Sequence, residues 1–155
     1  MARAIERSAA RLAAVQALYQ MDVTGKTLPD IFAEFETFWI GSEIEGETYN
    51  PAELAFFRDI LKGVLADQGP LDRTIDKTLI ASWPLARVDS VMRATLRGGA
   101  YELKKRRDIP ARVVIKEYVD VAGAFFGQEE SGMINAVLDG MAREFRADEF
   151  EAKPA

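Results

Sequence analysis

Apolar side chains recur at three- and four-residue spacing along almost the whole chain, which is the period of a helix that buries one face. In the first such segment the spacing is carried by Leu12, Val15, Leu18 and Tyr19. No segment alternates polar and apolar residues over the length of a strand with enrichment in β-branched side chains. We therefore predict an all-α fold.

Turn and capping residues divide this pattern into about seven helices. Short connections favour antiparallel neighbours, so we expect a helical bundle, with two packed sub-bundles as one arrangement. Residues 1–147 are predicted to form a single domain, and residues 148–155 a flexible C-terminal tail. The predicted helices span about 5–23, 28–39, 51–64, 71–79, 85–107, 114–125 and 133–145, and Gly25, Gly69, Pro70, Trp83, Pro84 and Pro110 mark breaks between them.

The composition argues against most kinds of enzyme. The chain has no cysteine and no histidine, so it lacks a thiolate nucleophile, the commonest general base near neutral pH and the ligands of most zinc sites. We therefore predict a protein that is not an enzyme and needs no cofactor. Without cysteine, a signal peptide or 18 consecutive apolar residues, the sequence also predicts a cytoplasmic protein outside the membrane.

Charge is unevenly distributed along the sequence. The formal net charge of -5 is unlike that of a protein that binds nucleic acid by itself, so any basic site must be local. In residues 28–59 eight acidic residues oppose one arginine, whereas in residues 85–116 nine basic residues oppose three acidic ones. The basic run 104–107 ends a predicted helix, where cations offset the helix dipole, and we prefer this interpretation to a nucleic-acid site.

The first helix carries the most suggestive polar pattern. Arg3, Arg7 and Arg11 recur every fourth residue and therefore share one helix face, where they could contact phosphates along a strand. Gln16 offers a hydrogen-bonding amide, and Tyr19 could stack on a base or pack against a partner. On spacing alone, an ordinary solvated helix face is the better interpretation.

Two further patterns favour structural roles. Gly98 and Gly99 lie inside a predicted helix, where each costs about 1 kcal/mol relative to alanine, and their use indicates that another backbone approaches closely. Glu129, Glu130 and Ser131 precede the last helix. They could form a catalytic carboxylate pair, but an N-terminal cap is the better interpretation because no histidine or metal cluster accompanies them.

Several motifs, in this order and spacing, closely resemble the NusB family of transcription antitermination factors. The resemblance covers nearly the whole chain, and it implies a fold of two small three-helix units. The motifs are RSAARLAAVQALY (7–19), FRDILKGV (57–64), VDSVMRATLRGGAYEL (88–103), DIPARVVIKE (108–117) and FGQEESGMINAVLD (126–139).

The resemblance implies that the protein binds single-stranded boxA RNA together with NusE, a ribosomal small-subunit protein. The complex would join RNA polymerase in antitermination on ribosomal RNA transcripts. Met133 stands where relatives usually carry an aromatic residue, and Met92 where they often carry an acidic one. The implied RNA-binding residues are Arg3, Arg7, Arg11, Gln16, Tyr19, Glu130, Ser131, Met133 and Asn135, and the implied partner-binding residues are Tyr19, Met92 and Arg93.

Two alternatives remain open on the sequence. NusB-like domains also occur at the N-termini of RNA methyltransferases, so the chain could be a detached RNA-recruiting domain, although it has no glycine-rich cofactor motif. It could also be a structural homodimer that pairs through Phe32, Phe35, Phe38 and Trp39. We prefer core packing for these aromatic residues, because exposed patches of that size are rare.

Overall fold

A computed structural model gives the fold of the chain. It describes residues 2–41, 51–80, 83 and 88–150, with side chains for 6–35, 54–79, 83 and 88–150. No helix in these ranges is both long enough and apolar enough to cross a membrane.

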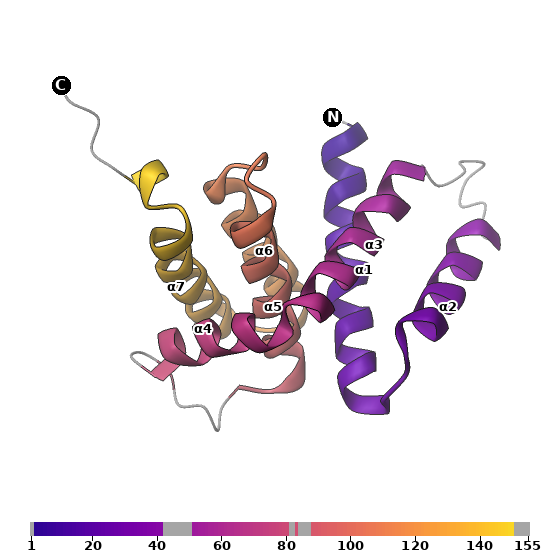
Figure 1. The fold of residues 1–155 in the computed structure, drawn as a ribbon, viewed down its shortest axis with the longest axis horizontal. Coiled ribbons are helices and arrows are strands. Elements are labelled where there is room, and N and C mark those ends of the chain that lie inside the picture. Colours follow the sequence, from indigo (N-terminus) through magenta and orange to yellow (C-terminus); the bar gives the residue numbers. More distant parts are fainter. Residues whose placement is uncertain (1, 42–50, 81–82, 84–87, 151–155) are drawn as a thin grey trace.

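The described ranges contain seven α-helices and one short 3-10 helix, η2, and no strand, which confirms the predicted all-α fold (Figure 1). Residues 147–150, near the C-terminus, are helical as well and form η2. The elements are α1 (Ala2–Thr24), α2 (Leu28–Gly41), α3 (Pro51–Ala66), α4 (Gln68–Ile80), α5 (Ser90–Lys105), α6 (Ala111–Phe125), α7 (Gln128–Phe145) and η2 (Ala147–Phe150).

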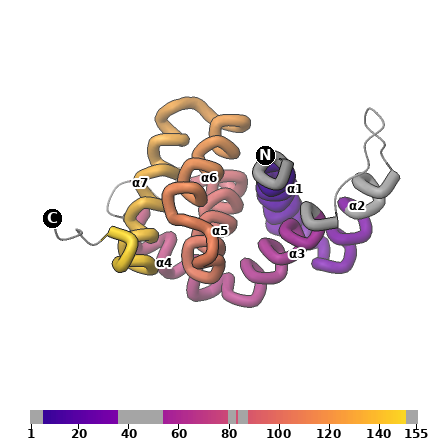
Figure 2. Tube along the Cα trace, turned by 90° about the horizontal axis from the view of Figure 1, so that it is seen from above, coloured from indigo at the N-terminus to yellow at the C-terminus, as the bar shows by residue number. Residues whose placement is uncertain are grey.

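The helices form two packed groups around a central α5. Helices α1, α2 and α3 lie on one side of the molecule, and α5, α6 and α7 on the other, with α4 packed across α5 and α7 (Figure 2). Helix α5 contacts α1, α3, α4, α6 and α7. Both groups of helices therefore pack against α5, which agrees with the predicted fold of two packed units.

Local chemistry sets the ends of several helices. Gly25 ends α1 with a positive φ of 75°, and its N–H donates to the carbonyl of Met21, 3.0 Å away. Asp89 caps α5 by accepting a hydrogen bond from the N–H of Met92, so this helix begins at Ser90 rather than near residue 85. Gly69 and Pro70 were expected to end α3 but lie in the first turn of α4, where proline costs nothing because that N–H has no partner in the helix.

The two glycines inside α5 make room for side chains, and the prediction that a backbone approaches them was wrong. A Cβ at Gly98 would lie 2.8 Å from Cε1 of Tyr118, and a Cβ at Gly99 would lie 2.8 Å from Cδ2 of Leu138. Tyr118 and Leu138 are fully buried. The glycines therefore let α6 and α7 bury large side chains directly against the central helix.

Arg146, close to the C-terminus, donates hydrogen bonds to the end of α5 and to the turn between α5 and α6. Its side chain is fully buried, and its guanidinium donates only to backbone carbonyls and to Glu149. These bonds supply donors to carbonyls at the C-terminal end of α5 and in the turn after it, although the carbonyl of Glu102 also accepts from the N–H of Arg106 and that of Arg106 from the N–H of Ile109. The acceptors are the carbonyls of Glu102, Leu103, Arg106 and Ile109.

The predicted C-terminal tail begins too early, because η2 is bound to the fold. Asp148 accepts a hydrogen bond from Arg107 at 2.7 Å. Glu149 accepts one from the N–H of Ala111 at 3.1 Å, which supplies the side-chain cap that Pro110 cannot give α6. The segment 148–150 therefore belongs to the domain, and the rest of the predicted tail lies outside the described residues.

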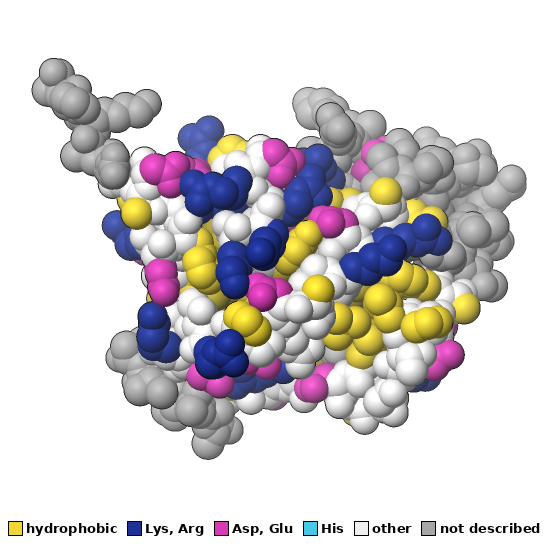
Figure 3. Space-filling view, viewed as in Figure 1, with side chains coloured by type: hydrophobic (Ala, Val, Ile, Leu, Met, Phe, Trp, Pro, Cys, Tyr) yellow, Lys and Arg dark blue, Asp and Glu magenta, His cyan; other side chains and the backbone are white. Residues whose placement is uncertain are grey.

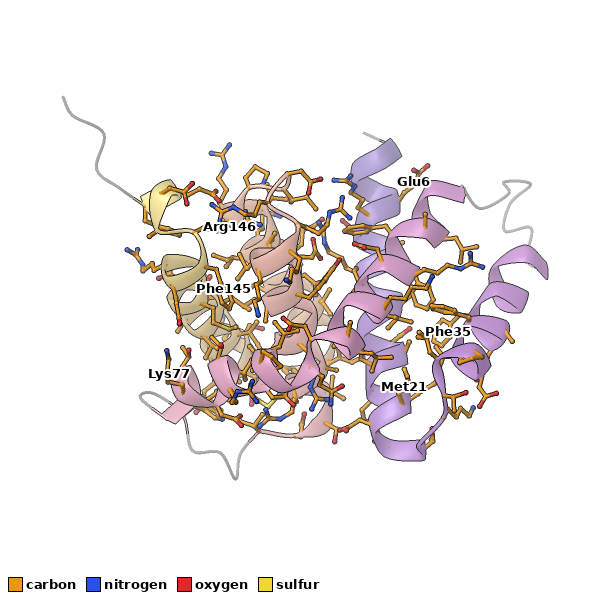
Figure 4. All side chains as sticks on the ribbon, viewed as in Figure 1. Glu6, Met21, Phe35, Lys77, Phe145 and Arg146 are labelled. Carbon is orange, nitrogen blue, oxygen red and sulfur yellow. The ribbon has the colours of Figure 1, made fainter. Side chains whose placement is uncertain are left out.

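The aromatic stripe of α2 packs within the chain. The rings of Phe32 and Phe35 lie 6.2 and 5.3 Å from that of Phe57 in α3. The side chains of Phe38 and Trp39 lie outside the described residues. For Phe32 and Phe35 the structure therefore agrees with core packing (Figure 4).

Glycine-to-alanine substitutions test the packing of α5. We expect Gly98→Ala to lower the free energy of unfolding by about 1–3 kcal/mol, because the buried ring of Tyr118 must move. Gly123→Ala, in open space on α6, should raise it by up to about 1 kcal/mol through helix propensity. Urea unfolding of both variants measures the difference, and equal effects at the two positions would contradict the packing argument.

Candidate functional site

Two arginines of α1 and one that follows α5 gather around one phenylalanine. The guanidinium carbons of Arg7, Arg11 and Arg106 lie 5.2, 5.1 and 5.2 Å from the centroid of the Phe56 ring. These distances are within the range of cation–π contacts. Phe56 lies on α3 and is 5% exposed, so the ring has a fixed position between α1 and the end of α5. We refer to these four residues as the arginine cluster.

The predicted row of arginines requires Arg11 to lie on the surface, but the structure buries it. Its side chain is only 2% exposed, and it forms a two-bond ion pair with the fully buried Glu102, with both distances 2.9 Å. Its third nitrogen donates to Glu117 at 2.8 Å. Each of its guanidinium nitrogens donates to a carboxylate inside the protein. We therefore assign Arg11 a structural role and remove it from the predicted RNA surface.

The same carboxylates bind two further groups. The hydroxyl of Tyr118 donates to Glu102, and that of Ser8 donates to Glu117 at 2.6 Å. Burial raises the pKa of Tyr118 well above its usual value, and Glu102 adds to the effect. For Arg11, burial alone would lower the pKa, but the hydrogen bonds and charge of Glu102 outweigh it and raise the pKa. This buried network joins α1 to α5 and α6.

Arg106 is also engaged with carboxylates. It donates to both oxygens of Asp108 at 3.0 Å and to Asp59 at 2.9 Å. The hydrogen bond from Arg106 lowers the pKa of Asp108 to about 2. Arg7 differs from both neighbours, because it has no hydrogen-bonded or ion-paired partner in the part of the chain that the structure describes, and it is half-buried.

A second candidate surface lies toward the other end of α1. Six side chains from α1, α5 and α6 line a groove of about 460 Å³. Tyr19 and Phe125 are 38% and 42% exposed, although both are large aromatic residues. The side-chain oxygen of Gln20 is buried and has no hydrogen-bond partner in the described structure. The lining residues are Val15, Gln16, Tyr19, Gln20, Val91 and Phe125, which we call the α1–α6 groove.

The two predicted partner residues on α5 occupy other places. Met92 is 2% exposed and belongs to the core, and Arg93 forms an ion pair with Asp76 at 2.8 Å. Their neighbour Val91 lines the groove instead. Periodicity indicated that both Val91 and Met92 lie on the apolar face of α5, but it could not tell which of them remains accessible.

The predicted residues near the last helix also differ in their exposure to solvent. Glu130 and Ser131 are half-buried in the first turn of α7, whose cap is Gly127, so they do not cap the helix as expected. Asn135 is exposed, whereas Met133 is 5% exposed and packs in the core. Met133 therefore cannot stack on a base in this conformation.

The candidate residues consequently form two separate sites. Arg7 is adjacent to Glu6 at one end of α1, whereas Tyr19 is close to Met21 at the other end (Figure 4). Twelve residues of helix between Arg7 and Tyr19 correspond to about 18 Å. The side chain of Arg3 lies outside the described residues.

Most of the basic segment is neutralised within the protein. Acidic and basic side chains alternate on the face seen in Figure 3, and they do not form a single basic surface. Three ion pairs follow one another along α5, with Asp67 just before α4 and with Asp72 and Asp76 of α4. They are Asp67–Lys104, Asp72–Arg97 and Asp76–Arg93. Arg107 pairs with Asp148, and Lys116 with Asp120. The charge separation along the sequence therefore becomes internal pairing in the fold.

Comparison with known proteins agrees with this fold and these motifs. A sequence profile of the NusB family matches residues 8–143. The chain belongs to the NusB family. This assignment covers both groups of helices, including α1 from Ser8 onward and the whole of α6.

Individual relatives match over almost their full length. The transcription antitermination protein NusB of Rhodopseudomonas palustris strain BisB18 is 64% identical over 148 residues, which are 96% of this chain and 88% of the relative. The protein of the same name from Bradyrhizobium diazoefficiens is 61% identical over 148 residues, covering 96% of this chain and 90% of the relative. The solved structure of T. maritima NusB superposes with a TM-score of 0.76 at 28% identity, covering 94% and 97% of the two chains.

Substitution of Arg11 and Arg7 separates a structural arginine from an accessible one. We expect Arg11→Met to lower the free energy of unfolding by about 3–5 kcal/mol, because Glu102 would remain buried without its cation. Arg7→Met should lower it by no more than about 1 kcal/mol, the contribution of an exposed cation–π contact. Chemical denaturation at neutral pH measures both, and similar losses would contradict the burial of Arg11.

Proposed function

We propose that this protein is a transcription antitermination factor that binds boxA RNA together with NusE and supports processive transcription of ribosomal RNA operons by RNA polymerase. The match to the NusB family over residues 8–143, with close relatives that bear the name transcription antitermination protein, carries the proposal. This role needs no cofactor and no catalytic group, and it places the protein in the cytoplasm.

We assign RNA contacts to the exposed edge of the arginine cluster and to part of the α7 turn. Arg7 is the member of the cluster whose N–H donors are available to a phosphate. Asn135 is exposed, and its amide suits a base edge, while Glu130 and Ser131 lie in the first turn of α7. Gln16 is exposed too, but it lines the α1–α6 groove, so we assign it to the partner surface. Phosphate contacts would thus position the strand, and the amide of Asn135 would contribute to specificity.

We assign NusE to the α1–α6 groove. Its exposed aromatic rings and valines form an apolar surface, and no lysine or arginine lines it, which suits a protein side chain better than a phosphate. A backbone or side-chain N–H from the partner would also satisfy the buried oxygen of Gln20. Tyr19 therefore serves the partner in this proposal and not the RNA.

A charge reversal at Arg7 tests the RNA surface. With NusE present, we expect Arg7→Glu to weaken binding of boxA RNA at least tenfold, because it replaces a phosphate contact by repulsion, on the order of 1.4 kcal/mol or more. Fluorescence titrations at several salt concentrations measure the affinity and its salt dependence. The helical circular dichroism spectrum should remain unchanged.

Lys77 provides a control for the charge change. It is 68% exposed on α4, and Figure 4 shows it far from Glu6, the residue before Arg7. Lys77→Glu makes the same change in net charge and should leave RNA affinity within about twofold of the original protein, since distant exposed charges are screened by salt. If Arg7→Glu and Lys77→Glu weaken binding equally, Arg7 has no specific role.

Truncation of the groove aromatics tests the partner surface. We expect Tyr19→Ala and Phe125→Ala each to weaken NusE binding by about 1–3 kcal/mol, as exposed aromatic anchors do at protein interfaces. Val113→Ala is the control, because Val113 is 37% exposed on the first turn of α6, outside the groove. Calorimetric titration with NusE measures the three affinities. Equal affinities for all three variants and the original protein would exclude this groove.

A further inference from the structure

We propose that Phe56 is a positioning residue for RNA binding, which holds the guanidinium of Arg7 ready for a phosphate while its two neighbours around the same ring are kept from the ligand. The inference rests on the proposed function, because it concerns how the RNA surface is prepared. The observation behind it is the gathering of Arg7, Arg11 and Arg106 around one buried ring.

The ring is a rigid platform. Phe56 is 5% exposed and belongs to the core on α3, so packing fixes its orientation. The guanidinium carbon of Arg7 lies 5.2 Å from the ring centroid. A planar guanidinium that stacks on a ring keeps its N–H donors in its own plane, so the contact orients the group without using any of its hydrogen bonds.

Two of the three guanidiniums already donate to carboxylates from every nitrogen, which leaves two of their five N–H groups unused in each. In Arg11, Nε and one terminal nitrogen donate to Glu102, and the other terminal nitrogen donates to Glu117. In Arg106, Nε and one terminal nitrogen donate to Asp108, and the other donates to Asp59. Every guanidinium nitrogen of both residues is therefore engaged with a carboxylate.

The same carboxylates allow three cations to remain close together. Like charges around one ring repel each other, and the two ion-paired arginines are neutralised by their acidic partners. Arg7 stays against Phe56 near Asp108, whose pKa its charge helps to lower, but no hydrogen bond or ion pair between the two is found in the described structure. Of the three arginines around Phe56, Arg7 is therefore the one that this arrangement leaves for a phosphate.

This arrangement predicts a loss of affinity when the ring is removed. Without the ring, Arg7 would have to be ordered when RNA binds, and ordering one long side chain weakens binding by about two- to tenfold. The charge of Arg7 would be unchanged, so a ring that acts only by positioning should leave the number of neutralised phosphates nearly the same. A loss of Arg7 itself should reduce the slope of log affinity against log salt by about 0.7.

The central experiment compares two neighbouring phenylalanines of α3. Phe56→Leu removes the ring under Arg7, whereas Phe57→Leu removes an equally buried ring that faces Phe32 and Phe35 of α2. Both variants, with NusE present, are titrated with boxA RNA. We expect Phe56→Leu to weaken binding about two- to tenfold and Phe57→Leu to leave it unchanged, although both lose core packing.

A double-mutant cycle shows whether the ring acts through Arg7. In the background of Arg7→Gln, Phe56→Leu should cause no further loss of RNA affinity. Phe56→Tyr, which keeps the ring face, should restore binding close to that of the original protein. If Phe56→Leu does not fold, Phe56→Met provides a flexible side chain of similar size without a ring.

The outcomes distinguish this inference from the proposed function. If Arg7→Gln leaves RNA affinity unchanged, the RNA surface itself is placed wrongly. If Arg7→Gln weakens binding but Phe56→Leu and Phe57→Leu have the same effect, Arg7 binds RNA without help from the ring, and the positioning role is overturned. Additive losses for Phe56→Leu and Arg7→Gln would overturn it as well.

Discussion

The buried ion pair between Arg11 and Glu102 is the interaction on which the rest of the structure depends. It joins α1 to the central α5, and through Glu117 and Tyr118 it also includes α6. Two charges without access to water are costly unless each satisfies the other, and here both carboxylate oxygens of Glu102 are bound. Any displacement of α1 along α5 would break several of these bonds at once, so the network determines the relative position of the two helix groups.

The internal use of charge explains how an acidic protein can still present a cationic group. Five basic residues of α5 and of the turn after it are paired with carboxylates of α3, α4, η2 or the residue between α3 and α4, so they contribute little field outside the molecule. Long-range attraction of RNA then has to come from another component, such as a basic ribosomal protein. The contribution of this chain would be short-range and directional, made by correctly placed donors.

Much of the fold could be predicted from the sequence, because helical periodicity and turn residues are local signals. All seven helices were expected, and Gly25 and Pro110 lie at breaks assigned to them. The site was less predictable. Regular spacing brought Arg7 and Arg11 to one face, but whether an arginine meets solvent or Glu102 depends on residues 91 positions away. Likewise the sequence gives no local signal that Phe56 lies beside an arginine or that Val91 lines a groove, since both depend on tertiary packing.

The position of Arg146 has a consequence for the order in which the protein can fold. During synthesis, α5 and the turn after it leave the ribosome about forty residues before Arg146 does, which corresponds to several seconds at common rates of translation. Until then the carbonyls of Leu103 and Ile109 lack the donor that Arg146 supplies, and Glu149 is not yet available to cap α6. The corner between α5 and α6 can therefore reach its final hydrogen bonding only after the end of α7 has been synthesised.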